Sequence, residues 1–169
     1  MKSFQKIYCE EIAYVWGCLR RLGVEDKNLE DKAHDVFITF YKKRNDFDAT
    51  RPVRPWLCGI AARVALDHNR LAYKKRELLS DQIAVDMTSL SPETAVERMD
   101  ARRRLLAALD TLDIDRRTVV VLHDIEGRSI PEIAEIIDAP INTLYSRLRL
   151  ARQQLTAWLR REPARRCGT

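Results

Sequence analysis

Side chains suited to contact nucleic acid are concentrated near the end of the chain, between Ile141 and Arg161, a stretch without any acidic residue. A helical period there predicts an apolar face of Leu144, Leu148, Ala151 and Leu155. The remaining positions are polar: Asn142, Thr143, Ser146, Arg147, Arg149, Arg152 and Gln153. Arginine binds phosphates and guanine edges, Asn and Gln pair with adenine, and Ser and Thr serve either purpose. The pattern favours a DNA-contacting helix over an arginine-rich surface helix.

A short helix is predicted just before this stretch. Ser129 and Glu132 have the spacing of a capping box, and Pro131 falls in the first turn, where its missing N–H costs nothing. Its apolar stripe is Ile130, Ile133, Ala134 and Ile137. The letters DAP then interrupt the helix, and Asn142 is the expected cap of the next one. Two helices joined by a tight break predict a helix-turn-helix, whose second helix enters the major groove.

The composition predicts a helix-rich protein, so the elements around this motif are expected to be helices as well. Of 169 residues, 33% are charged and 46% hydrophobic, with only five glycines and six prolines, which is typical of a helix-rich protein. The net charge of +5 is compatible with a polyanionic partner without establishing one. No apolar run approaches membrane-spanning length, and Glu10 and Glu11 interrupt the first segment. We therefore expect a cytoplasmic protein with no membrane insertion.

Three helices are predicted in the first half. The first has an apolar stripe that ends at Gly23: Phe4, Tyr8, Ile12, Val15, Leu19 and Leu22. The second begins at a capping pair of Asn28 and Asp31 and directs Ala33, Val36, Phe37 and Phe40 to the core. The third directs Trp56, Leu57, Ile60, Val64 and Leu71 inward and ends in a basic cluster.

Periodicity is lost from Leu78 to Pro92, which predicts a linker. The expected organisation is all-α: two small helical domains, 1–77 and 93–169, joined by a flexible linker, 78–92, with the helix-turn-helix in the second. That domain has Leu105, Leu109 and Leu112 on one helical face. The apolar run from Val119 to Leu122 predicts its buried central helix, which Gly127 ends.

Catalytic and metal sites are not indicated. We expect no metal and no cofactor, because the cysteines and histidines lack metal-ligand spacing; they are Cys9, Cys18, Cys58, Cys167, His34, His68 and His123. The four cysteines are expected to be reduced thiols. No nucleophile elbow, phosphate-binding glycine loop or paired carboxylates can be identified, so no enzyme is predicted.

With these motifs together, the chain resembles the extracytoplasmic-function (ECF) class of bacterial RNA polymerase sigma factors. GRSIPEIAEIIDAPINTLYSRLRLARQQL is similar to the family's promoter-reading helix-turn-helix. DKAHDVFITFY is similar to its polymerase-clamp helix, and RPWLCGIAARVALDHNR to its Trp-Leu…Ile-Ala…Leu-Asp…Arg helix. The chain departs from the family pattern at His34, Arg63, Asn142, Tyr145 and Leu150.

The resemblance implies three interactions. The clamp of the polymerase core would meet Asp31, His34 and Asp35. The loop 45–54 would open the minus-ten element, with Asp46, Phe47 and Asp48 near an extruded base. The backbone of the opened strand would be contacted by Arg63, Asn69, Arg70, Lys74 and Lys75. The minus-thirty-five element would meet Asn142, Thr143, Ser146, Arg147, Arg149 and Arg152, with Arg147 and Arg149 reading bases. An anti-sigma protein is a further expected partner.

Two other interpretations remain open from the sequence. A stand-alone helix-turn-helix regulator explains the second domain equally well but gives the acidic helix, loop and basic helix of the first no role. A helical adaptor that binds only protein does not explain the basic second helix. Salt-dependent DNA binding would exclude this adaptor.

Overall fold

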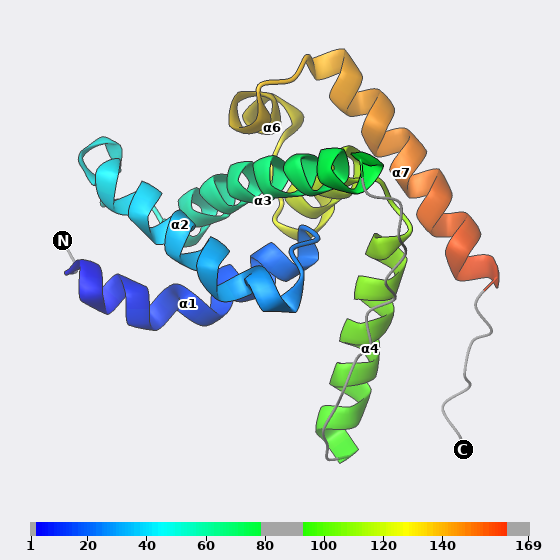
Figure 1. The fold of residues 1–169 in the computed structure, drawn as a ribbon, viewed down its shortest axis with the longest axis horizontal. Coiled ribbons are helices and arrows are strands. Elements are labelled where there is room, and N and C mark those ends of the chain that lie inside the picture. The colour runs from blue at the N-terminus through cyan, green and yellow to red at the C-terminus, as the bar shows by residue number, and fades with distance from the viewer. Residues whose placement is uncertain (1–2, 79–92, 162–169) are drawn as a thin grey trace.

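The computed structural model describes residues 3–78 and 93–161, with side chains omitted at 74–78 and 93–98. The described residues form helices and no strand. In chain order these are α1 (Phe4–Arg21), η1 (Asp26–Asn28), α2 (Leu29–Lys42), η2 (Arg44–Asp46), α3 (Val53–Leu78), α4 (Glu93–Asp110), α5 (Ile114–Val120), the π-helical turn η3 (Val121–Ile125), α6 (Ile130–Ile137) and α7 (Ile141–Arg161). The all-α prediction is therefore confirmed (Figure 1). In this part of the chain no helix is long and apolar enough to cross a membrane.

The N-terminal unit consists of α1, α2 and α3, which pack against one another in all three pairs. Ser3 caps α1 by accepting from the Lys6 amide, and Gly23 ends it with φ +87°, a conformation that favours glycine. The predicted core residues of α2 are all buried, as are Leu57 and Ile60 of α3. Burial of these apolar faces holds the three amphipathic helices together.

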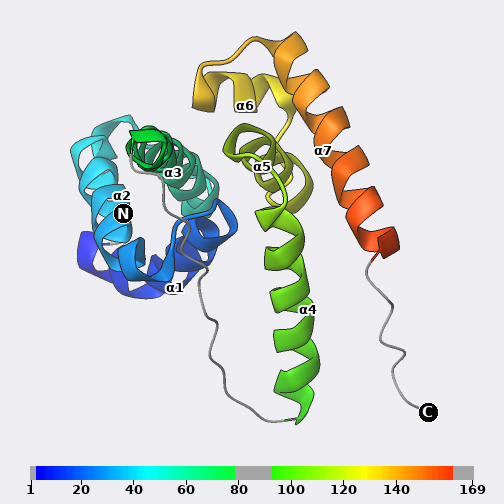
Figure 2. The same ribbon diagram turned by 45° about the vertical axis from the view of Figure 1, so that its right-hand side comes forward.

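The C-terminal unit, α4 to α7, is built around α5 and η3. Asp113 caps α5 by accepting from the Arg116 amide, and the run Val119 to Leu122 is buried throughout, as predicted. Helix α7 packs along α5, and Leu144, Leu148 and Ala151 provide its buried face (Figure 2).

The two units share one continuous apolar core. Helix α3 contacts both α5 and α6, and Figure 2 shows the α1–α3 group beside the α5–α7 group, with α4 extending away from both. This packing places the basic side of α3 against the helix-turn-helix. The predicted linker 78–92 lies, apart from Leu78, outside the described residues.

Four detailed sequence predictions are wrong. Leu71 is 68% exposed and so does not face the core, and Leu105 is 41% exposed while Leu106 packs inward. Asn28 makes no side-chain capping bond, since a 3-10 turn precedes α2. Asn142 is not a cap either, because α7 already begins at Ile141.

Candidate nucleic-acid interface

Helices α6 and α7 form the predicted helix-turn-helix. The capping box is present: the Ser129 hydroxyl accepts from the Glu132 amide, and the Glu132 carboxylate accepts from the Ser129 amide at 2.8 Å. Asp138 adopts a left-handed conformation, φ 51°, that ends α6 and redirects the chain. The candidate base and phosphate ligands Asn142, Thr143, Ser146, Arg149 and Arg152 are all exposed on α7. This surface therefore has the geometry of a recognition helix.

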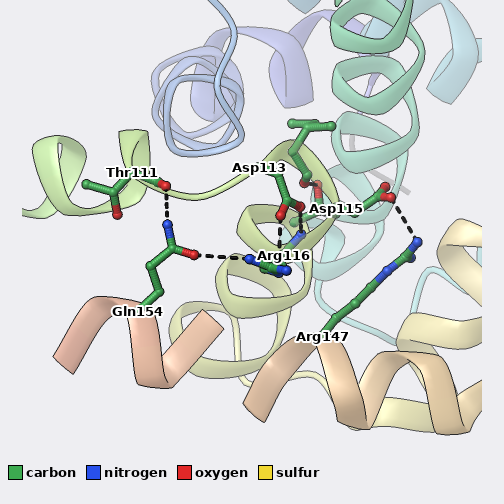
Figure 3. Close-up of polar contacts among 8 residues, drawn as sticks. Thr111, Asp113, Asp115, Arg116, Arg147 and Gln154 are labelled. Atoms are coloured by element: carbon green, nitrogen blue, oxygen red, sulfur yellow. Dashed lines mark hydrogen bonds and ion pairs between the residues drawn. The ribbon is translucent and has the colours of Figure 1, made fainter. Parts of the chain in front are cut away.

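Arg147 is less available than the sequence pattern suggests. Its guanidinium donates to Asp115 of α5 at 2.8 Å, and its side chain is 25% exposed (Figure 3). Arg152 similarly pairs with Asp124, an interaction that lowers the pKa of that carboxyl. Arg149 is different: among the described residues no hydrogen bond or ion pair engages its guanidinium. It is the arginine of the predicted set most free to approach DNA.

A second network fixes α7 on the loop before α5. The Gln154 amide donates to the Thr111 carbonyl, and its oxygen accepts from Arg116 at 3.2 Å (Figure 3). Arg116 in turn pairs with Asp113, the α5 cap. These contacts lie within the C-terminal unit and hold α7 in a fixed orientation.

The loop preceding α3 is organised by its own residues. Asp48 accepts from the amide and hydroxyl of Thr50, at 3.0 and 2.6 Å, and this lowers the pKa of its carboxyl. The Phe47 ring stacks on Trp56 with centroids 4.9 Å apart, and Trp56 packs edge-on against Phe40. Asp46 is exposed at the end of η2. The loop thus presents two carboxylates beside a partly buried aromatic stack.

The basic side of α3 faces the C-terminal unit. Arg63 donates to the carbonyls of Ile136 and Glu135 at the end of α6, where a cation complements the helix dipole. Arg70 pairs with Asp115 at 3.1 Å, and Asn69 donates to the Leu22 carbonyl. The side chains of Lys74 and Lys75 lie outside the described residues.

Asp115 therefore joins both candidate DNA-binding helices. Its carboxylate pairs with Arg70 from α3 and with Arg147 from α7. DNA phosphates approaching either arginine would compete with this carboxylate. No local pattern identifies it, because the three residues meet only in the tertiary structure.

Two further contacts between the units were not predicted. Arg117 is buried, 7% exposed, and donates to the carbonyls of Arg21 and Arg20 at the end of α1, at 2.7 and 3.1 Å. Glu126 accepts from Tyr14 at 2.6 Å and from Arg21. Burial, together with the Glu126 bond, raises the pKa of Tyr14. A signal for Arg117 was present, since it lies two residues before the run from Val119 to Leu122, which is buried throughout.

The candidate polymerase-binding residues lie on the outer side of α2. Lys32 bridges Asp31 and Asp35 at 3.0 and 2.7 Å, and its hydrogen bond lowers the pKa of Asp31. His34 is exposed and stacks beside Tyr8. The structure adds two exposed apolar side chains further along α2, Ile38 and Tyr41, which sequence analysis missed.

One group of potential metal ligands is assembled by the fold. The sulfurs of Cys18 and Cys58 and a carboxylate oxygen of Glu126 lie within 4.8 Å of one another. The residues are 40 and 68 positions apart in sequence, so spacing motifs did not reveal them. Glu126 already accepts two hydrogen bonds, which leaves the two thiols as the unassigned pair.

Comparison with known proteins places each unit in a family. Residues 10–75 match the Sigma-70 region 2 model, and residues 102–155 match the Sigma-70 region 4 model. The ECF RNA polymerase sigma factor SigW of Bacillus subtilis is 31% identical over 156 residues, covering 85% of this chain and 81% of that protein. RNA polymerase sigma factor NccH of Alcaligenes xylosoxydans xylosoxydans is 28% identical over 144 residues, covering 83% and 77%.

Solved structures agree with the fold. CnrH in complex with the cytosolic domain of CnrY has a TM-score of 0.60 and 25% identity, covering 93% of this chain and 87% of that one. The sigma factor RpoE of Bartonella quintana, in complex with the anti-sigma factor NepR, has a TM-score of 0.67 and 21% identity, covering 96% and 99%.

Proposed function

The chain belongs to the ECF class of RNA polymerase sigma factors, and from this premise we propose which residues perform each task. It binds RNA polymerase core and directs promoter-specific transcription initiation. We propose that residues 1–77 bind the clamp and the minus-ten element, that 93–169 bind the minus-thirty-five element, and that 78–92 connect them. We also propose that it catalyses no reaction itself and that it works in the cytoplasm, where core polymerase meets DNA.

Helix α7 reads the minus-thirty-five element from the major groove. Its exposed polar residues Asn142, Thr143, Ser146, Arg149 and Arg152 support this assignment. A bidentate arginine–guanine contact gives ~1–3 kcal/mol of discrimination against the wrong base. Arg149 is the first base reader in our proposal because its guanidinium is exposed, and Arg147 follows once it leaves Asp115.

The loop 45–54 and α3 open and hold the minus-ten element. In our proposal the exposed carboxylates of Asp46 and Asp48 accept from an exocyclic amine of an extruded base. Phe47 supports the loop through Trp56, and a base would stack on it only by extending this aromatic stack. Arg63, Asn69, Arg70, Lys74 and Lys75 follow the strand backbone.

The clamp of the polymerase meets α2. Asp31 and Asp35 offer charge to basic clamp residues, and His34 lies beside them. Ile38 and Tyr41 continue the same exposed helical face at steps of three and four and add an apolar contact. A combined acidic and apolar stripe suits an interface better than a solvated acidic face.

We also propose that the described arrangement differs from the promoter-bound one. Elements 25 base pairs apart are separated by roughly 85 Å of B-DNA, at about 3.4 Å per pair. In the structure, α3 packs directly against α5 and α6, and Arg63 and Arg70 are engaged by the C-terminal unit. The units must separate for both elements to be read. An anti-sigma protein, such as NepR in the complex with RpoE, would hold this chain away from polymerase.

The observation that carries the proposal is an exposed, acid-free α7 on the same chain as an acidic and apolar α2 face. The test is core binding followed by run-off transcription on genomic fragments. Reversing the charge of Asp31 and Asp35 should weaken core binding by at least about tenfold, a loss of ~1.4 kcal/mol. Asp26→Lys, on exposed η1 outside this face, is the matched control. Unchanged core binding in the double variant would remove the clamp assignment.

The same experiment separates the rival function. A stand-alone regulator would bind promoter duplex without core and would produce no new start sites. Discrete start sites that depend on added protein would instead define the promoter sequence. Loss of those start sites in an Arg149→Ala variant, with core binding intact, would connect α7 to promoter reading.

A further inference from the structure

Two buried thiols have no part in the assignments above. Cys18 of α1 and Cys58 of α3 are both fully buried, and their sulfur atoms lie 3.0 Å apart. They are 40 residues apart in sequence and meet because α1 and α3 pack together. Cys9, in contrast, is an exposed thiol on α1.

We propose that Cys18 and Cys58 form a reversible intramolecular disulfide, with a hydroperoxide as the oxidant. A disulfide bond measures about 2.05 Å, so the sulfurs need to approach by only about 1 Å. Both side chains already point toward the same spot in the core, so no helix has to move far. The inference does not depend on the proposed transcriptional function, because it concerns the chemistry of the pair.

The groups around Cys18 and Cys58 keep the two thiols reduced until an oxidant gains access to them. A hydrogen bond between the thiols, and then burial, raise the pKa of Cys18, so this thiol is protonated and slow to react at neutral pH. Tyr14 and Arg21 lie close by, where they hold Glu126, whose carboxylate lies within 4.8 Å of both sulfurs. Local opening of this cover is therefore needed for reaction.

A groove borders the side chains that cover the pair. A groove of about 500 Å³ between α1 and α4 is lined by Tyr14, Gly17 and Arg21, which surround Cys18 along α1. Neither thiol lines the groove, but Tyr14 and Arg21 do, and these two side chains hold Glu126 beside the sulfurs. A small neutral oxidant such as hydrogen peroxide in this groove would reach the thiols when these two side chains move aside.

The reaction balances in two steps. One thiol attacks a peroxide oxygen, the O–O bond breaks, and the thiol proton leaves with the departing oxygen as water. The resulting sulfenic acid is attacked by the second thiol, which forms the S–S bond and releases a second water. Two thiols are oxidised by two electrons, and one hydrogen peroxide is reduced to two waters. A dithiol reductant reverses the change by thiol–disulfide exchange.

The test uses the full chain with Cys9→Ser and Cys167→Ser, so that only the pair can react. Cys167 lies outside the described residues. The folded protein is treated with hydrogen peroxide, denatured and alkylated. We expect no alkylation, a mass lower by two hydrogen atoms, and one linked peptide pair containing Cys18 and Cys58. The melting temperature should rise by roughly 5–15 °C, from the closed 40-residue loop, and fall again with reductant.

Three results would overturn the proposal. The first is full alkylation of both thiols after a peroxide dose that oxidises Cys9 in the unmodified chain. The second is a gain of oxygen atoms without a linked peptide. The third is one equivalent of Zn²⁺ that copurifies, blocks oxidation and is lost on Cys58→Ala, which would assign the cluster with Glu126 to a metal instead. A peroxide-treated Cys58→Ala variant supplies the control, since it cannot lose two hydrogens within one chain.

Discussion

Asp115 holds two arginines that DNA would otherwise engage, so its charge should oppose DNA binding. Its carboxylate pairs with Arg147 at 2.8 Å and with Arg70 at 3.1 Å. These side chains are 32%, 25% and 51% exposed respectively, so each pair is screened by solvent and contributes ~0.2–1 kcal/mol. Asp115→Asn removes both pairs. The two pairs together contribute ~0.4–2 kcal/mol, so we expect duplex DNA to bind ~2–30-fold more tightly, at about 1.4 kcal/mol per tenfold change.

The assay is fluorescence anisotropy with a duplex containing the upstream element, at several salt concentrations. Each additional phosphate contact should steepen the logarithmic salt dependence by about 0.9. Asp113→Asn is the matched control: it removes the same charge two residues away, and Asn still caps α5 as Asp113 does through the Arg116 amide. Equal or weaker binding by Asp115→Asn than by this control would refute the competition and indicate that Asp115 orients Arg147 for DNA.

The remaining predictions test other parts of the structure. Arg117→Met should lower the free energy of unfolding by about 2–4 kcal/mol in denaturant titration, since buried carbonyls at the end of α1 lose their donor, while Arg116→Met should cost much less. The pKa of Glu132 is lowered by its hydrogen bonds to Ser129, so its contribution to α6 is present above the ordinary value of 4.5 and is lost as pH falls through the lower folded value. Glu132→Gln, which retains the capping box, should remove this acid dependence of the Ser129 amide signal in NMR; an unchanged titration would contradict the assignment. Arg149→Ala should reduce discrimination between promoter bases by ~1–3 kcal/mol in competition binding, and a uniform loss across sequences would instead indicate a phosphate contact.

Local features of the fold were predictable from the sequence. The Ser129–Glu132 capping box, the break after α6 and the buried run from Val119 to Leu122 depend on residues within one or two helical turns. At two of the positions where the prediction failed, distant packing decided the outcome. Leu71 and Leu105 have the right period for an inward face, but no neighbouring helix covers them sufficiently.

The candidate site was predictable only in part. The residue types on α7 were identified, and Asn142, Thr143, Ser146, Arg149 and Arg152 are exposed as expected. Their roles in contacting DNA, and those of the clamp and minus-ten residues, stay predictions. The pairing of arginines with carboxylates was not visible, because charge on one helix says nothing about which acid another helix brings near it.

The sequence by itself determined the class of protein, the helices and the face of α7, because each of these depends on periodicity, caps and motifs written in neighbouring residues. Only the tertiary structure decided which distant groups meet. Packing of α3 against α5 and α6 brings Asp115 between Arg70 and Arg147, and packing of α1 against α3 brings Cys18 to Cys58. Such contacts depend on how apolar surfaces from different helices fit together, and no local pattern specifies that fit.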